Sequence, residues 1–182
     1  MTMSGQEGAR PITSLLAADH RRLDELLRSA ATTVGQIDQS IYDQFRVGLL
    51  RHIGMEEKVL WPALQRWRGG EPLPLAAKLR LDHGALATLL MPAPTAQILA
   101  TIRRILSDHN QLEEGPDGLY ALCDRLPDAE MEPLLVALRA APQLSVMRHS
   151  DSPAVMKTLA GALARAGYGL ETVASPEKDE RG

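Results

Sequence analysis

The sequence predicts an all-α protein, built as an up-down-up-down four-helix bundle with a C-terminal helical extension. Leu and Ala are abundant along the 182 residues, runs of β-branched residues are absent, and no stretch keeps the two-residue alternation of a half-buried strand. Glycine and proline signals divide the first part of the chain into four long helical segments. Short connections between long helices favour antiparallel neighbours, which is the reason for predicting a bundle.

The four long helices are predicted from their start and stop signals. They cover residues 13–33, 38–68, 72–91 and 95–114. Thr13 or Ser14 can cap the first helix, and Gly69-Gly70 stops the second. Pro92-Ala93-Pro94 separates the third helix from the fourth, which Gly115-Pro116 ends. Each connection is short enough for the next helix to return along the previous one.

Weaker helical signals follow at residues 117–126 and 131–140, and a stronger one covers residues 153–166. Ser152 and Pro153 form a favourable N-cap and first-turn pair, and Gly167 stands where a helix-ending glycine is expected. We therefore divide the chain into a loose N-terminal arm, the bundle, a helical extension and a disordered tail, which cover residues 1–11, 12–115, 116–170 and 171–182.

Composition excludes several functional classes. The chain has 20 Lys and Arg against 23 Asp and Glu, and aromatic residues make up only 3%, so neither phosphate attraction nor base stacking favours a nucleic-acid partner. A single cysteine, Cys123, excludes an internal disulfide, a four-thiolate zinc site and a cysteine-ligated iron–sulfur cluster. No apolar run approaches the roughly 20 residues that cross a bilayer, and the N-terminal residues lack a signal-peptide core. We expect a soluble cytoplasmic protein without a membrane partner.

Four of the five histidines fall one to each predicted bundle helix. At about 100° per residue, each of them lies on the apolar face that a bundle buries. A glutamate follows two of them four residues later, in His52–Glu56 and His109–Glu113, so imidazole and carboxylate share one helix face. A buried unpaired carboxylate costs several kcal/mol or takes up a proton, and a pair of metal ions bridged by the carboxylates removes that cost. The predicted metal ligands are His20, His52, Glu56, His83, His109 and Glu113.

Other polar residues near these histidines are weaker candidates. A single histidine on an apolar helix face is more often a core or boundary residue than a ligand, and His149, outside the four helices, is interpreted in that way. Asp24, one turn after His20, is expected to accept a hydrogen bond from the imidazole or to add a ligand. Glu57 points about 140° away from His52 on an ideal α-helix and is expected to be solvated.

A small cavity is expected beside the metal ligands. Its predicted walls are Leu16, Leu49, Leu86 and Ile105. Gly48, one turn before His52, has two interpretations that the sequence leaves open: space for a diatomic ligand, or close packing of two helices.

The four helices resemble the hemerythrin-like family, the HHE cation-binding domains. That family has a histidine early in its first helix, HxxxE in the second, a histidine in the third, and HxxxE or HxxxD in the fourth. The matching segments in this chain are Asp19–Asp24, His52–Pro62, Asp82-His83 and His109–Glu113, within residues 10–115. The order and spacing of all four segments make the resemblance specific.

The resemblance implies a non-haem di-iron centre in which Glu56 and Glu113 bridge the irons and the four histidines are terminal ligands. Imidazole and carboxylate donors also suit manganese or zinc, and the resemblance is what favours iron. Oxygen-carrying members have a fifth histidine one turn before the third-helix histidine, where this chain has Leu79. The missing imidazole leaves a coordination position for water, another carboxylate or a small ligand, so reversible oxygen storage is not expected as the main role.

Three functions are compatible with these features. The leading one is a di-iron protein that binds, senses or reacts with a small ligand such as oxygen, nitric oxide or peroxide, or with iron itself. A second is a metal-stabilised regulatory or interaction module without catalysis, in which residues 117–182 contact a partner or form a homo-oligomer. A third is an oxidase or peroxidase with turnover, which the sequence neither supports nor excludes. In the second function an apolar stripe docks on the bundle or outside it, at Met131, Leu134, Leu135 and Leu138.

Overall fold

The computed structural model describes residues 10–31 and 36–172, and its regular secondary structure in these ranges is helical, without a β-strand. The predicted all-α class is therefore confirmed. The elements are α1 (Pro11–Ala30), α2 (Gln39–Met55), the π-helix η1 (Glu56–Leu60), α3 (Trp61–Trp67), α4 (Ala76–Leu89), α5 (Ala96–Glu114), α6 (Leu119–Cys123), α7 (Asp128–Arg139) and α8 (Pro153–Ala166). Most of the predicted arm and tail lies outside the described residues, as does the predicted end of the first helix. No helix in the described ranges is both long enough and apolar enough to cross a membrane.

Local signals set the ends of several helices. Thr95 and Ser152 cap α5 and α8 by accepting backbone hydrogen bonds at 3.1 and 3.3 Å, so both helices begin where predicted. Gly167, with a φ of 87°, ends α8. The first helix begins earlier than the predicted Thr13, at Pro11, because proline is favourable in a first turn, where its missing N–H removes no helical hydrogen bond.

The predicted second helix is continuous but not uniform. α2 passes directly into η1 and then into α3, and Gly69-Gly70 follows as predicted. In a π turn the hydrogen bond spans five residues instead of the four of an α-helix, so the side chains of η1 are rotated relative to an ideal α-helix. The third helix begins later than predicted, at Ala76, because Leu75 has a left-handed backbone with a φ of 63°.

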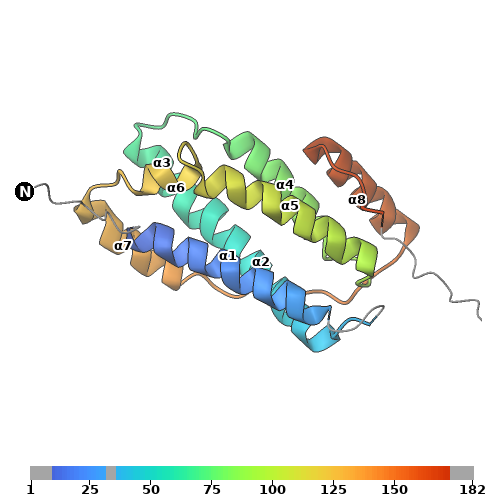
Figure 1. The fold of residues 1–182 in the computed structure, drawn as a ribbon. Coiled ribbons are helices and arrows are strands. Elements are labelled where there is room, and N and C mark those ends of the chain that lie inside the picture. Colours follow the sequence, from blue (N-terminus) through green and yellow to red (C-terminus); the bar gives the residue numbers. More distant parts are fainter. Residues whose placement is uncertain (1–9, 32–35, 173–182) are drawn as a thin grey trace, which may run out of the picture.

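α1, α2, α4 and α5 lie side by side along most of the molecule (Figure 1). α1 packs against α2 and α5, and α4 packs against α5. At the end of the molecule where α3 lies, α6 and α7 pack on α1, whereas α8 packs on α4. The part of the chain after residue 115 therefore covers two separate regions of the central helices.

The buried apolar side chains form two clusters, and the predicted histidines lie between them. Cluster 1 gathers residues of α1, α3, α6 and α7 with single residues of α2, η1 and α4, and cluster 2 gathers residues of α1, α2, α4, α5 and α8. The predicted histidine ligands of α1, α2 and α4 are His20, His52 and His83. In the sequence, each of them stands between a residue of cluster 1 on one side and a residue of cluster 2 on the other. These flanking pairs are Leu16 and Leu23, Met55 and Leu49, and Leu79 and Leu86. The polar layer is thus enclosed by apolar packing on two sides.

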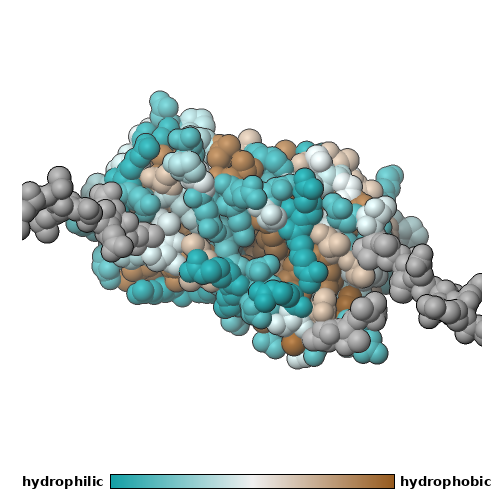
Figure 2. All heavy atoms as spheres, in the orientation of Figure 1, coloured by the Kyte–Doolittle hydropathy of each residue, from teal (hydrophilic) through white to brown (hydrophobic). Residues whose placement is uncertain are grey.

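The apolar stripe of the extension is buried within the chain. Its four residues on α7 belong to cluster 1 together with Ile12 of α1. Leu159 and Leu163 of α8 belong to cluster 2. Of the two placements predicted for the stripe, the structure shows docking on the central helices. Hydrophilic residues predominate on the face shown in Figure 2, with hydrophobic residues visible between them.

Candidate metal site

The structure brings all six predicted ligands together in one buried layer. None of them is more than 4% exposed, and both glutamates are fully buried. They form two groups of possible ligands, in which one ligand atom per residue lies within 4.8 Å of the others. The first group is His20, His52, Glu56 and Glu113, and the second is Glu56, His83, His109 and Glu113. Because both glutamates belong to both groups, the carboxylates lie between two pairs of imidazoles.

Each of the four imidazoles has a carboxylate partner at its Nδ1 atom. The partners are Glu114 for His20 at 2.5 Å, Asp19 for His52 at 3.0 Å, Glu57 for His83 at 2.9 Å and Asp82 for His109 at 3.6 Å. A carboxylate accepts hydrogen bonds, so the three contacts of 3.0 Å or less place the ring hydrogen on Nδ1 of His20, His52 and His83 and leave their Nε2 atoms with a lone pair. The contact between His109 and Asp82 is too long for a hydrogen bond. Outer carboxylates of this kind fix the orientation of metal-binding imidazoles.

The inward Nε2 atoms lie close to one another and to both glutamate carboxylates. The Nε2 atoms of His83 and His109 are 3.2 Å apart. Oxygen atoms of Glu56 and Glu113 lie 3.2–3.4 Å from the Nε2 atoms of the four rings. With Nδ1 of His83 donating outward, its Nε2 presents a lone pair to Nε2 of His109 and to a carboxylate oxygen of Glu56. A proton or a metal ion between these atoms joins them.

Glu57 is not solvated, which corrects the expectation from an ideal α-helix. Its side chain is 28% exposed, and Oε1 accepts the hydrogen bond from Nδ1 of His83. The π turn that begins at Glu56 explains the difference, because its wider spacing rotates Glu57 away from the predicted direction. Two consecutive glutamates therefore serve the same site, one facing the inward nitrogens and one orienting an imidazole.

Asp24 does not have either of the roles predicted for it. Its side chain is 65% exposed and pairs with Arg28. Within the described residues, the Nδ1 atom of His20 instead contacts Glu114, which reaches it from α5. The sequence placed Asp24 and His20 on one face of one helix, whereas the actual partner comes from a neighbouring helix.

Gly48 and His149 have structural roles away from the ligands. A Cβ atom on Gly48 would lie 2.9 Å from side-chain atoms of Arg22 and Leu23, so close packing of α1 on α2 is the interpretation that holds. The ring of His149 stacks on Tyr42, with the ring centroids 6.1 Å apart. Its interpretation as a residue other than a ligand therefore agrees with its position.

Tyr120 is a site residue that the sequence analysis did not identify. Its hydroxyl oxygen lies 2.9 Å from Oε1 of Glu56, 3.1 Å from Nε2 of His20 and 3.3 Å from Oε2 of Glu113. A tight turn after α5 brings it there. At Gly118 an added Cβ would come within 2.3 Å of the Glu113 carbonyl oxygen, so this close approach requires glycine.

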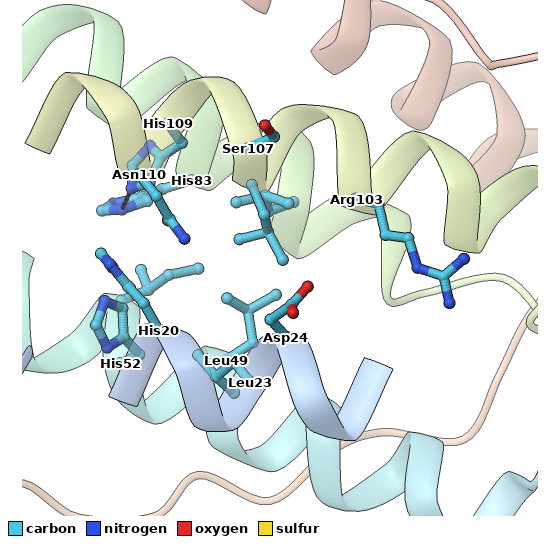
Figure 3. Close-up of a pocket in the computed structure, with 13 residues that line it drawn as sticks. His20, Leu23, Asp24, Leu49, His52, His83, Arg103, Ser107, His109 and Asn110 are labelled. Carbon is cyan, nitrogen blue, oxygen red and sulfur yellow. Dashed lines mark hydrogen bonds between the residues drawn. The ribbon is translucent and has the colours of Figure 1, made fainter. Parts of the chain in front are cut away.

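A cavity of about 180 Å³ reaches the four histidines (Figure 3). Its outer part is lined by the exposed residues Asp24, Arg103 and Ser107. Its apolar walls are Leu23, Leu49, Ile53, Leu86 and Leu106. Two of the four predicted walls are therefore present, but Leu16 and Ile105 are fully buried in the apolar clusters and do not line the cavity.

The donor set fits a pair of metal ions. His52 Nε2, Glu56 Oε2 and Glu113 Oε1 are buried and have no hydrogen-bond partner among the described residues. Buried polar atoms without a partner are rare, and an ion is one of the ordinary reasons for them. Four imidazoles and two carboxylates are donors that iron, manganese and zinc accept.

A comparison with protein families supports the same interpretation. The family model of the hemerythrin HHE cation-binding domain matches residues 12–120. The chain belongs to this family. Searches of the curated proteins and of the solved structures give no match. The resemblance seen in the sequence is thereby confirmed, and the matched part of this hemerythrin domain includes both HxxxE pairs and Tyr120.

The buried charges of the hemerythrin domain stabilise one another. Burial lowers the pKa of His52, but the carboxylates of Glu56, Asp19 and Glu113 together outweigh this effect and raise the pKa to about 10. Burial also opposes a charged His109, yet its contacts with Asp82 and Glu113 raise the pKa to about 9. Burial disfavours a charged Glu56 as well, and the imidazoles beside it hold its pKa well below the usual value. Without metal, protons therefore lie among the inward nitrogens.

Chelator-treated protein is expected to lose stability as the pH rises from neutral to about 10. His52 and His109 have pKa values raised from 6.5 to about 10 and about 9, so their contribution is complete below pH 6.5 and disappears as the pH passes through the raised values. Metal ions bound by these imidazoles would replace the protons, so the metal-loaded form is expected to keep its stability in this range. Melting temperatures measured across this pH range test the difference, and parallel curves for the two forms would contradict it.

Proposed function

We propose that the protein holds a non-haem di-iron centre, in which Glu56 and Glu113 bridge the ions and the four histidines are terminal ligands. One observation carries the proposal: the buried donors form two groups that share both glutamates. Carboxylates between two cations reduce the repulsion between them. Iron, when bound, supplies redox chemistry and open positions for a small molecule. Manganese and zinc accept the same donors, and membership of the hemerythrin family favours iron.

We also infer that the helices around this centre form an up-down-up-down four-helix bundle. The course of the chain supports this topology, because α1 and α4 run in one direction and α2 and α5 return along them (Figure 1). The division of the chain at residue 115 stays a prediction. α6 and α7 lie beyond that boundary, yet they share cluster 1 with α1.

The cavity supports a small, weakly polar ligand such as oxygen, nitric oxide or peroxide. Its volume is about 180 Å³, and an apolar cavity of about 150 Å³ already accepts benzene. Leu23, Leu49 and Leu86 line the cavity beside the imidazoles. The polar residues Arg103 and Ser107 remain at the exposed end. These walls favour small neutral molecules over large charged ones.

The metal content per chain of protein purified under air tests the proposed centre. The proposal predicts two iron ions per chain, one for each group of ligands, together with the near-ultraviolet absorption of a ferric cluster. Anaerobic titration with nitric oxide then tests whether a small ligand binds. A folded protein that contains no metal and cannot be loaded with iron would overturn the proposal.

Replacing Leu106 by tryptophan is expected to slow the binding of nitric oxide by about tenfold, which corresponds to about 1.4 kcal/mol of barrier. Leu106 is half-buried on the cavity wall and is not a proposed ligand, so a larger ring there should narrow the path. Leu50 is a matched control, because it is also half-buried but packs against cluster 2 outside the cavity. Stopped-flow measurements should separate the two variants at equal iron content. Equal slowing in both would exclude this cavity as the route.

The alternative is a metal-stabilised regulatory or interaction module that forms a homo-oligomer. The observation that favours it is the exposure of Val136 (56%) and Met147 (83%) in the extension. Light scattering of the metal-loaded and metal-free protein at several concentrations distinguishes the two functions. A dimer that depends on bound metal favours the module, whereas a monomer under both conditions favours the ligand-binding role.

A further inference from the structure

The hydroxyl of Tyr120 faces three acceptors with one hydrogen to donate. Its oxygen lies within 3.3 Å of two carboxylate oxygens, from Glu56 and Glu113, and of Nε2 of His20. The hydrogen on His20 is directed away from the phenol, because Nδ1 contacts Glu114 at 2.5 Å. One phenolic hydrogen satisfies only one of these neighbours. A cation among the four atoms would satisfy all of them.

The three neighbours of the Tyr120 oxygen all belong to one group of ligands. Glu56, Glu113 and His20 are three of the four members of the first group, and the fourth is His52. Donor atoms that surround one ion at about 2.0–2.2 Å lie about 3 Å from their neighbours. The distances of 2.9, 3.1 and 3.3 Å from the Tyr120 oxygen match this spacing.

Oxygen-carrying members have a histidine one turn before the third-helix histidine, and this chain has no metal donor at that position. Leu79, one turn before His83, is fully buried in cluster 1. Tyr120 comes from α6 instead, and the imidazole that it contacts is His20 of the first group rather than His83. The two groups are therefore unequal, because in the described structure the Tyr120 oxygen contacts an imidazole of the first group and none of the second, while both groups share the two glutamates.

We propose that Tyr120 is a ligand of the metal ion held by His20 and His52, bound through its deprotonated phenol oxygen. This inference rests on the proposed metal centre. On binding, the O–H bond of Tyr120 breaks, a bond from the same oxygen to the metal forms, and the proton leaves to the solvent. The ion at His83 and His109 has no tyrosine ligand. Tyr120 does not line the cavity, so its ligation leaves the open side of the histidines free for an incoming molecule.

The chain offers a matched control for the role of this hydroxyl. The three tyrosines are Tyr42, Tyr120 and Tyr168. Tyr42 is as fully buried as Tyr120, but its ring contacts Phe45 and His149 and its hydroxyl has no hydrogen-bond partner in the described structure. Tyr42→Phe therefore removes a buried hydroxyl without changing the ligand groups.

The experiment reloads chelator-treated protein with ferrous iron under air and compares the original chain with Tyr120→Phe and Tyr42→Phe. We expect a broad visible phenolate-to-iron(III) absorption in the original chain and in Tyr42→Phe, and its loss in Tyr120→Phe at the same iron content. Tyr120→Phe should also release one proton fewer per chain on metal binding. Full occupancy without this absorption in the original chain, or an unchanged absorption in Tyr120→Phe, would overturn the inference.

Two further measurements keep the inference separate from folding and from the proposed centre. If Tyr120→Phe does not fold, resonance Raman spectra of the iron-loaded original chain show whether phenolate ring vibrations accompany the visible absorption, and their absence refutes the ligand. Zinc titration gives the same answer by ultraviolet difference spectroscopy, which counts tyrosines that lose a proton. If the chain takes up no metal, the proposed metal centre itself is contradicted. If the chain takes up two ions and its three tyrosines all stay protonated, only the assignment of Tyr120 as a ligand is contradicted.

Discussion

Glu56→Ala is expected to reduce the metal content from two ions per chain to less than one. Glu56 belongs to both groups of ligands, so its removal takes one donor from each ion and leaves the imidazoles without the negative charge that balances two cations. His52 and His83 then face an empty position beside Nε2. Metal analysis after dialysis against a weak chelator measures the loss, and two ions retained by Glu56→Ala would contradict the assignment of this residue.

Alanine variants of two other glutamates serve as comparisons for Glu56→Ala. Glu57→Ala removes the hydrogen-bond acceptor of His83 but no proposed ligand, so metal affinity should fall by about 10–100-fold while loading remains complete at high metal concentration. Glu132→Ala removes an exposed carboxylate on α7 and should change neither quantity. A graded order across the three variants supports the geometry of the site, whereas equal effects would indicate a general loss of charge or stability.

A chain that ends at Gly115 is expected to be unfolded or insoluble. The deletion removes α6, α7 and α8, whose leucines complete both apolar clusters. Each buried leucine contributes about 1.5–3 kcal/mol, and the total stability of a domain is about 5–15 kcal/mol. The loss therefore exceeds what the remaining helices can supply. It also uncovers Ile12, Leu16 and Met55, which are buried in the full chain.

A chain that ends at Thr172 is the control for this deletion, because it keeps every described helix. It should remain soluble, bind metal and melt as the full chain does. Circular dichroism and thermal melts compare the two. A soluble, helical and metal-binding chain ending at Gly115 would show that the extension is a separate module, which is the outcome that the interaction hypothesis requires.

The sequence allowed much of this site to be predicted because its main signals are local. A histidine and a glutamate four residues apart share a helix face wherever that helix packs, and apolar neighbours indicate that the face is buried. The six predicted ligands lie in one layer for that reason. The caps at Thr95 and Ser152 are equally local, because each acts on its own first turn.

The features that the sequence did not reveal depend on other parts of the chain. Glu114 reaches His20 from another helix, and helix spacing alone favoured Asp24 instead. Tyr120 follows a break at Gly115 that ends the predicted bundle, and only the folded turn at Gly118 shows that the chain returns to the ligands. A tyrosine has no local spacing rule that connects it to a distant glutamate. Contacts of this kind are set by packing, and one sequence does not specify them.

The π-helix η1 places an extra residue into a segment that is otherwise α-helical. A scaffold designer who copies the HxxxE motif onto an ideal α-helix would reproduce the His52–Glu56 pair and turn Glu57 toward solvent. The imidazole of His83 would then lose the acceptor that fixes its ring. A designed scaffold for this site must therefore include the segment Glu56–Leu60 with its π turn. A scaffold that reproduces the ligand positions alone will place the residues from Trp61 onward in the wrong helical register.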